Sequence, residues 1–255
     1  MTEMQGRLPG IRVRPEDIPT HGLVVGDPAR AAAASKHLTD AKEVGNFREY
    51  LSFAGTYKGK RVIISSHGVG AAGAALCFES LMYGGCKTII RAGTCGAYRE
   101  DIQDGDFIIS LGNVREDGTS DQLIPMSYPA LAHYQVVRAL ELAARNAGFS
   151  KPHMGIVWTH ANFIPGLLPN MRDMWMQANV IGVEMELSCL LVIASLRGAR
   201  AGGILVSDGN YVRRKREAAA GKVYNPFTDY NPMREVVFRG VETMITVALD
   251  ALVSL

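Results

Sequence analysis

The sequence has little of several features that would mark a specialised class of protein. Its 255 residues include only four cysteines, at 77, 86, 95 and 189, with no C-x-x-C pair and no zinc-ligand spacing to a histidine. We therefore expect reduced, buried thiols. No apolar run is long enough to cross a bilayer, and the N-terminal stretch MTEMQGRLPGIRVRPEDI lacks the apolar centre of a signal peptide. These absences predict a cytoplasmic protein with no membrane partner.

An excess of one charge is also missing. The 27 lysines and arginines nearly balance 25 aspartates and glutamates, and the net charge of +2 gives no overall attraction to nucleic acid. The one dense basic run, Val212-Arg-Arg-Lys-Arg-Glu217, is short and has no interleaved aromatic residues, so we interpret most of it as a solvated loop. At 47% hydrophobic residues, the chain can bury the core of a single domain covering residues 1–255.

Valine- and isoleucine-rich runs alternate with helical patterns along the chain. The expected strands cover 21–26, 87–93, 106–114, 154–160 and 202–208, with a hairpin over 48–66 that turns at Lys58-Gly59. The expected helices cover 28–38, 71–83, 131–147, 183–198 and 234–254. This alternation predicts an α/β fold with a mostly parallel or mixed sheet. Ligands of such sheets bind at the carboxyl ends of the strands, where the chemistry should be sought.

A glycine-rich stretch, His67-Gly-Val-Gly-Ala-Ala-Gly73, follows one of these strands with the spacing G-x-G-x-x-G. A dinucleotide fold needs this loop at its first strand and an acidic residue about 20 residues further on, at the end of the next strand. Here the loop follows a later strand, and the next one ends in Arg91. An NAD-dependent dehydrogenase is therefore disfavoured, although the loop's N–H groups suit an anion or a polar ligand edge.

Two arginines lie at predicted strand ends. Arg30 stands four residues past Gly26, and Arg91 is followed closely by Thr94 in a glycine-rich loop. One such arginine would most simply form a structural salt bridge, because an unpaired buried charge is costly. Two of them beside a loop of glycine and threonine favour an oxyanion site, since guanidinium groups match the geometry of phosphate oxygens.

Six motifs then occur in a fixed order: G-D-P-x-R at 26–30, N-x-R-E-Y at 46–50, S-H-G-V-G at 66–70, R-A-G-T-C-G at 91–96, V-E-M-E at 183–186 and S-D-G at 207–209. This ordered set resembles the nucleoside phosphorylase family, which includes hexameric purine nucleoside phosphorylases and uridine phosphorylases. The family converts a nucleoside and phosphate into free base and ribose 1-phosphate. The resemblance covers roughly residues 11–210. It implies a single-domain, three-layer α/β/α fold with a mixed central sheet, and a homo-oligomer, commonly a hexamer, with active sites at a dimer interface.

The resemblance also assigns the phosphate site, with inorganic phosphate as co-substrate and no metal or other cofactor. Gly26, Arg30, Arg91 and Thr94 resemble the phosphate cradle, and Arg48 resembles an arginine that the adjacent subunit contributes. Three arginines around an anionic nucleophile serve mainly to position it and to balance its charge.

The residues that resemble the nucleoside pocket are Cys95, Gly96, Phe163, Glu184, Met185 and Glu186. Glu186 would hold the ribose hydroxyls with Met185 against the sugar, and Phe163, in Asn162-Phe-Ile-Pro165, would stack on the base. Asp208 resembles the acid that protonates a leaving purine at N7, because a purine leaves poorly as an anion. Carboxylates at a helix N-terminus would explain Glu184 equally well.

The class of base that we expect follows from the residues at the positions of the family's uracil site. Uridine phosphorylases of this family hold uracil with a glutamine and an arginine, and by spacing Leu167 and Pro169 take those places here. We therefore expect purine nucleosides, with 6-oxopurines such as inosine and guanosine ahead of adenosine. The three arginines favour phosphate over water as the nucleophile. The alternatives are a uridine phosphorylase, a phosphate-independent nucleosidase and a non-catalytic nucleoside-binding protein.

Three features depart from the family pattern or stay open. Gly10 stands where many members carry a histidine that binds a neighbour's 5′-hydroxyl, so a 5′-modified substrate remains an alternative. The arginine that often pairs with the acid has three candidates, Arg213, Arg214 and Arg216. The segment 211–233 is a candidate lid over the site.

Overall fold

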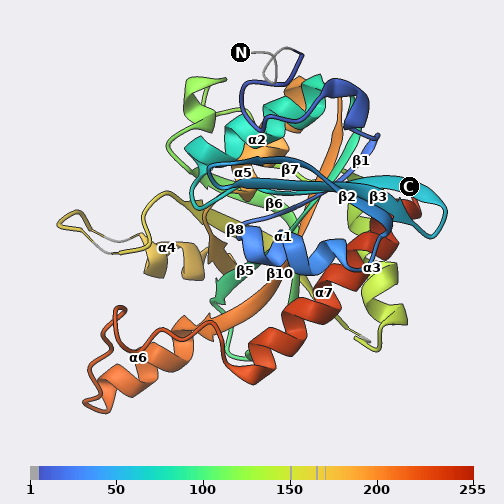
Figure 1. Cartoon of the computed structure of the whole chain (residues 1–255). Helices are drawn as coiled ribbons and strands as arrows, with labels where there is room; N and C mark the ends of the chain where they lie inside the picture. Colours follow the sequence, from blue (N-terminus) through green and yellow to red (C-terminus); the bar gives the residue numbers. More distant parts are fainter. Residues whose placement is uncertain (1–5, 150, 165, 170) are drawn as a thin grey trace.

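The computed structural model describes residues 6–149, 151–164, 166–169 and 171–255. Ten strands in these ranges form one sheet. They are β1 (His21–Val25), β2 (Thr39–Phe47), β3 (Tyr50–Tyr57), β4 (Lys60–Ser66), β5 (Thr88–Ala97), β6 (Phe107–Glu116), β7 (Ala130–Leu131), β8 (His153–His160), β9 (Gly182–Glu184) and β10 (Arg200–Asn210). Figure 1 shows the sheet running through the centre of the molecule.

The sheet is mixed, as the sequence predicts. Its order is β10-β6-β8-β9-β5-β1-β4-β3-β2, with β7 beside β6. β1 runs parallel to both β4 and β5, whereas β3 pairs antiparallel with β2 and β4. β10 pairs with β5 as well as with β6, so the strands β5, β9, β8, β6 and β10 close into a ring. The sequence did not predict this closure.

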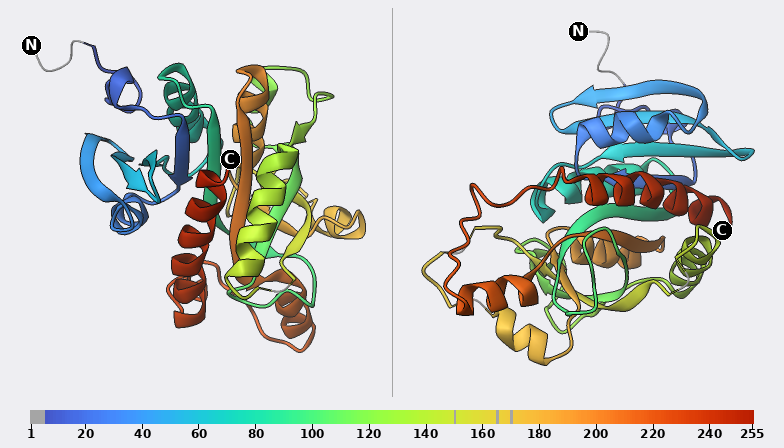
Figure 2. Two further views of the ribbon diagram at one scale, coloured as in Figure 1. Left: turned by 90° about the vertical axis from the view of Figure 1, so that its right-hand side faces the viewer. Right: turned by 90° about the horizontal axis from the view of Figure 1, so that it is seen from below.

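Helices cover both faces of the sheet (Figures 1 and 2). They are α1 (Pro28–Ser35), α2 (Ala71–Tyr83), α3 (Tyr134–Asn146), α4 (Arg172–Gln177), α5 (Leu187–Leu196), α6 (Tyr211–Ala219) and α7 (Glu235–Val253), with short 3-10 turns η1 (Pro15–Asp17) and η2 (Ser120–Gln122). One apolar core lies between the sheet and α1, α3 and α7, and a second lies against α2 and α5. The predicted three-layer α/β/α fold is confirmed.

Two expectations for local structure were wrong. The helix expected over 183–198 begins only at Leu187, because Gly182–Glu184 instead pair as β9 with β5 and β8. The basic run expected as a loop forms α6, where the Asn210 side chain accepts a hydrogen bond from the Arg213 N–H and so caps the helix. The alanines that close the run favour a helix as well. α4 and α6 lie at the same end of the molecule, away from the layered core (Figure 1).

Candidate active site

Asp208 reaches the site through an irregularity in β10. Ser207 lies opposite Cys95 on the parallel strand β5, and Gly209 lies opposite Gly96, so the register slips at Asp208. A bulge of this kind re-aims a side chain and is frequent beside active sites. The Asp208 side chain is buried and hydrogen-bonds with Thr94 on β5. The fold thus brings the S-D-G and R-A-G-T-C-G motifs together.

The Asp208 carboxyl has a second partner that lies outside all six motifs. The Tyr230 hydroxyl donates a 2.6 Å hydrogen bond to Asp208 Oδ2. Burial raises the pKa of Asp208, while the hydrogen bonds from Tyr230 and Thr94 and the charges of two nearby arginines oppose that shift. The net direction is upward, so this carboxyl keeps a proton to higher pH than an ordinary aspartate.

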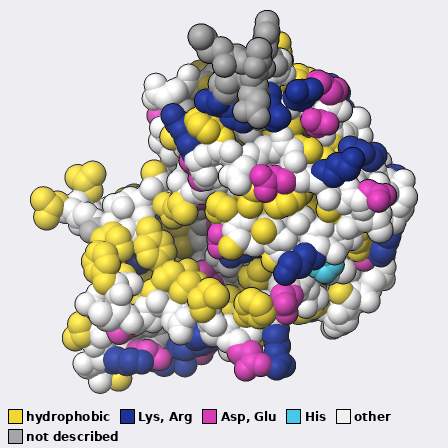
Figure 3. Space-filling view, in the orientation of Figure 1, with side chains coloured by type: hydrophobic (Ala, Val, Ile, Leu, Met, Phe, Trp, Pro, Cys, Tyr) yellow, Lys and Arg dark blue, Asp and Glu magenta, His cyan; other side chains and the backbone are white. Residues whose placement is uncertain are grey.

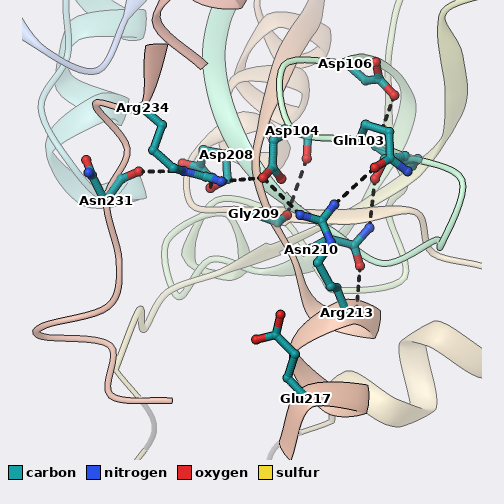
Figure 4. A network of polar contacts seen from close by, with 12 residues as sticks. Gln103, Asp104, Asp106, Asp208, Gly209, Asn210, Arg213, Glu217, Asn231 and Arg234 are labelled. Carbon is teal, nitrogen blue, oxygen red and sulfur yellow. Dashed lines mark hydrogen bonds and ion pairs between the residues drawn. The ribbon is translucent and has the colours of Figure 1, made fainter. Parts of the chain in front are cut away.

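A polar network ties the neighbourhood of Asp208 to the β5–β6 connection (Figure 4). Arg234 donates to the Asp208 backbone carbonyl at 2.6 Å and also pairs with Asp104. Arg213 reaches the same Asp104 carboxylate at 3.2 Å. Asp104 therefore joins the first turn of α6 to the residue that precedes α7.

None of the three candidate arginines forms an ion pair with the Asp208 carboxylate within the described ranges. Arg213 pairs with Asp104, and Arg216 pairs with Glu100. Arg214 lies over the ring of Tyr224 at 4.2 Å and affects the pKa of Asp208 through its charge alone. The hydrogen-bond partners of the Asp208 carboxyl are Tyr230 and Thr94.

Arg91 is buried within β5, which continues past it to Ala97 and does not end there. Its guanidinium pairs with Glu186 and lies 3.5 Å from Glu184 Oε2. Its Nε and Nη1 have no hydrogen-bond partner among the residues the structure describes. Buried donors without acceptors are costly, and an anion would satisfy them. A side chain at Gly93 would collide with this guanidinium, which explains the glycine.

The glycine-rich loop serves Glu186. Gly68 and Gly70 have φ angles of +75° and +92°, which L side chains rarely adopt. The Gly70 N–H, exposed by this conformation, donates to Glu186 Oε1 at 2.7 Å. Burial acts to raise the pKa of Glu186, but Arg91, His67 and this N–H outweigh it and hold the pKa below its usual value. Glu186 is therefore an ionised carboxylate with a fixed orientation.

Glu184 supports this arrangement from β9. Its Oε2 accepts from the backbone N–H groups of Glu186 and Leu187, each at 2.8 Å, and so caps the start of α5. Thr159 donates to Oε1 at 2.5 Å. Burial, together with the Glu186 charge, raises the pKa of Glu184 although Arg91 opposes the shift. Glu184 thus has a clear structural task, and Met185 lies half-buried between the two carboxylates.

Arg30 projects from the first turn of α1, next to Gly26. The side chain is half-buried and makes no hydrogen bond or ion pair within the described part of the chain. Burial lowers its pKa, and the positive charge of Arg91 lowers it further. The two arginines therefore repel each other, and at Arg30 the charges of Asp27 and Asp208 oppose this repulsion without forming an ion pair. An anion bound there would relieve their repulsion.

Four residues singled out from the sequence lie at the margins of this site. Arg48 is exposed at the tight turn between β2 and β3, over the ring of Phe47, and within the described ranges it forms no ion pair. Phe163 is half-exposed, with its ring centroid 5.2 Å from that of Tyr230. Leu167 is fully exposed and Pro169 is also exposed, while Pro165 lies outside the described residues.

Cys95 and Gly96, predicted to line the base pocket, lie on β5, and Gly10 lies against α2. Cys95 is buried, and burial raises the pKa of its thiol. Gly96 beside it is partly exposed. Gly10 packs against α2, where a Cβ would lie 2.5 Å from Ser80 Oγ, so no side chain fits at this position. All four cysteines are free and buried, as expected.

Figure 3 shows a hollow on this face of the molecule, with hydrophobic side chains around its rim and acidic side chains on its inner wall. No three His, Cys, Asp or Glu side chains in the described ranges converge in a way that could hold a metal ion. Within those ranges, no helix has both the length and the apolarity needed to cross a membrane.

Comparison with known proteins gives consistent matches. A model of the phosphorylase superfamily matches residues 20–226. A purine nucleoside phosphorylase of Plasmodium falciparum is 38% identical over 208 residues, covering 81% of this chain and 84% of that protein. A uridine phosphorylase of Treponema pallidum is 32% identical, covering 80% and 83%. A crystal structure of Toxoplasma gondii purine nucleoside phosphorylase in complex with immucillin-H superimposes with a TM-score of 0.88 at 30% identity, covering 100% of this chain and 98% of that one.

Proposed function

The chain belongs to the phosphorylase superfamily, within its nucleoside phosphorylases, and from this premise we propose that it cleaves purine nucleosides with phosphate, giving free base and ribose 1-phosphate. One observation carries the proposal. A buried carboxyl with a raised pKa, Asp208, lies beside an arginine site in which Arg30 has no partner within the described residues. The pair supplies a proton donor and an anion site in one pocket, as phosphorolysis of a purine nucleoside requires.

Phosphate binds between Arg30 and Arg91 in this account. The Nε and Nη1 atoms of Arg91 have unused donors, and Arg30 supplies a cation that forms no ion pair within the described chain. The Thr94 hydroxyl and the backbone near Gly26 complete the cradle. Two guanidinium groups fix both the position and the charge of the nucleophile, which is most of what this reaction needs from a protein.

The chemical step follows from that placement. A phosphate oxygen forms a bond to C1′ while the bond from C1′ to N9 breaks, and the bonding electrons pass to the purine. Asp208 delivers its proton to N7, so the base leaves as a neutral molecule. The sugar gains positive charge in the transition state, which the anionic phosphate beside it stabilises. Asp208 is left ionised and takes its next proton from solvent.

Glu186 orients the sugar. Its carboxylate is already held by the Gly70 N–H, so its remaining lone pairs have fixed directions. The O2′ and O3′ hydroxyls of ribose are donors that such a carboxylate accepts, and hydrogen bonds to a charged group are the strong ones. The glycine-rich loop thus helps to bind a nucleoside by fixing this carboxylate.

Purines are favoured over uridine. Asp208 is useful to a leaving group that carries N7, which uracil lacks. Leu167 and Pro169, at the positions predicted for a uracil clamp, offer no side-chain hydrogen bond and are exposed to solvent. The P. falciparum protein with 38% identity is named a purine nucleoside phosphorylase, which agrees with this choice. Within the purines, we place inosine and guanosine ahead of adenosine.

A homo-oligomer, a hexamer in this proposal, completes the site. Arg48 stands exposed at the tip of the β2–β3 hairpin, with φ at +56° and its guanidinium 5.1 Å from the Phe47 ring centroid. An exposed cation at the end of a hairpin is well placed to reach a neighbouring copy. We propose that Arg48 contributes to the phosphate site of the adjacent subunit.

A substrate panel tests the proposal. The pure protein is incubated with inosine, guanosine, adenosine, uridine and 5′-methylthioadenosine, each with and without phosphate, and free base is measured. We expect phosphate-dependent release from purine nucleosides. Release from uridine alone would overturn the purine assignment, and release without phosphate would identify a nucleosidase. No release from any nucleoside would favour a binding protein.

A further inference from the structure

Tyr230 lies beside the two residues to which the proposed function assigns the purine base, Asp208 and Phe163. It lies on the segment that joins α6 to α7, and its hydroxyl is bonded to Asp208 Oδ2. Its ring stands against Phe163, with centroids 5.2 Å apart and planes at 58°. These two contacts coincide with the two that the proposed function gives to the base, a hydrogen bond at N7 and stacking on Phe163.

The hydroxyl and N7 make opposite demands on the carboxyl. The Tyr230 O–H donates, so it stabilises an ionised Asp208. N7 is an acceptor and needs a protonated one. A hydrogen bond from Tyr230 and a hydrogen bond to N7 therefore favour different protonation states of this carboxyl.

We propose that Tyr230 is a displaceable specificity residue, which favours the ionised form of Asp208 in the free protein and, when a purine replaces it, allows Asp208 to take up the proton that N7 requires. The inference rests on the proposed function. It links binding of the base to protonation of Asp208. A base with an acceptor at N7 thereby promotes protonation of the acid that its own cleavage requires.

The electrostatics of Asp208 give this displacement its effect. Burial is the largest influence on its pKa and acts upward, and the Tyr230 hydrogen bond is the largest influence acting downward. Without the Tyr230 hydroxyl, the upward effect of burial on the pKa of Asp208 is less opposed. The other charged or titratable groups that act on Asp208, from β5, α1, α6 and the start of α7, are Cys95, Arg30, Arg214 and Arg234. All three arginines favour the ionised form, so the loss of Tyr230 is partly compensated.

The chain around Tyr230 permits movement. Asp104 pairs with Arg213 at the start of α6, and with Arg234 at the end of the segment just before α7 (Figure 4). Between them the side chains are largely exposed: Val223 is 88% exposed and Phe227 is 78% exposed. Few buried contacts hold this stretch, so Tyr230 can leave without unpacking either helix.

The pH dependence of Tyr230→Phe tests this. The substitution keeps the ring and removes only the donor. Activity needs protonated Asp208, so kcat/KM for inosine falls as pH rises through its pKa in the free protein. In Y230F we expect this fall in kcat/KM to occur at a pH higher by about one unit, which corresponds to a tenfold change in proton affinity. The KM for inosine should fall several-fold. Tyr224→Phe is the matched control, since this tyrosine lies on the same segment and contacts Arg214 through its ring.

The outcomes separate the two proposals. The inference is supported if the fall in kcat/KM shifts to higher pH in Y230F and stays at the wild-type pH in Y224F. An active Y230F with an unshifted fall in kcat/KM and an unchanged KM overturns it and leaves the proposed function standing. A wild-type protein that releases no base in the presence of phosphate overturns both. Should Y230F fold poorly, the wild-type protein can be titrated by carboxyl-carbon NMR, where hypoxanthine should raise the pKa of the signal that Asp208→Asn removes. An unmoved pKa would refute the inference.

Discussion

Arg91 and Glu186 form a buried ion pair between β5 and the start of α5. The proposed reaction assigns the arginine to phosphate and the glutamate to ribose, so in the empty site each neutralises the other. Phosphate and ribose must therefore bind to an arginine and a glutamate that are already paired with each other. Phosphate draws on the Arg91 donors that Glu186 leaves unused, and the sugar draws on the carboxylate lone pairs that Arg91 and Gly70 leave unused.

Glu186→Gln should therefore separate phosphate binding from turnover. With the carboxylate neutral, Arg91 is free for phosphate, and the KM for phosphate should stay level or fall. Nucleoside turnover should fall by roughly 10- to 100-fold, because hydrogen bonds from the ribose hydroxyls to a charged group are lost. Steady-state kinetics in both substrates measure this split. Glu79→Gln, at an exposed arginine pair with Arg197, is the control. A KM for phosphate that rises with the loss of turnover would contradict the assignment.

Arg30→Ala should impair phosphate use with little effect on stability. Arg30 has no partner in the described chain and its charge is repelled by Arg91, so its removal breaks no ion pair. The KM for phosphate should rise by about 10-fold or more, as expected for a lost charge-assisted hydrogen bond. The Tm without phosphate should stay within a few degrees of the wild-type value. Arg61→Ala, an exposed arginine on β4, serves as control. A large loss of Tm with an unchanged KM would give Arg30 a structural role.

Asp208→Asn should remove the proton donor and keep the fold. We expect the rate of inosine phosphorolysis to fall by roughly 10²- to 10⁴-fold, the range for loss of a general acid. A nucleoside whose N7 is already alkylated, such as 7-methylguanosine, carries its positive charge before it binds and needs no acid. The variant should therefore retain most activity on 7-methylguanosine. Equal losses on both substrates would point to misplacement of the pocket and away from proton transfer.

His67 predicts how stability depends on pH. The ring is wholly buried, and burial, aided by the charge of Arg91, lowers its pKa to about 4. An unfolded chain binds this proton near pH 6.5. Below that pH the unfolded state gains protons that the native state refuses, so stability is lost as pH falls from about 6.5 to about 4. The loss attributable to His67 is about 3 kcal/mol.

Urea unfolding at pH 7, 5.5 and 4.5 measures this effect. His67→Gln should lose less stability over that range than the wild-type protein, whereas His37→Gln, at an exposed position, should follow the wild-type. Parallel curves for all three proteins would show that His67 is not the group responsible.

The alternation of strands and helices could be predicted because it depends on local pattern, whereas the three layers were implied by the resemblance to the family. α2 begins and ends at the expected residues, and the hairpin turns at Lys58-Gly59 as predicted. β9 was missed because three residues are too few to show a period. The ring closure was missed because it needs β10 to pair with two strands that are distant in the chain.

The candidate site could be proposed from the sequence where its residues belong to motifs. Asp208, Glu186 and Arg91 belong to short runs with recognisable spacing, and the fold brings those runs together. Tyr230 belongs to no motif. It reaches Asp208 from a segment 22 residues further on, through a loop whose path depends on the Asp104 network. The Asn210 cap and the alanines after the basic run were signals for α6 that could have been used.

The most direct measurement follows the phosphate itself. Inosine and inorganic phosphate are incubated with the protein, and the mixture is observed by ³¹P NMR while hypoxanthine is measured in parallel. The account predicts a new phosphate-ester resonance, ribose 1-phosphate, in a one-to-one ratio with hypoxanthine, and no base when phosphate is left out. Hypoxanthine released as inorganic phosphate stays unchanged would show that water is the nucleophile, and would contradict the central claim that Arg30 and Arg91 hold a reacting phosphate.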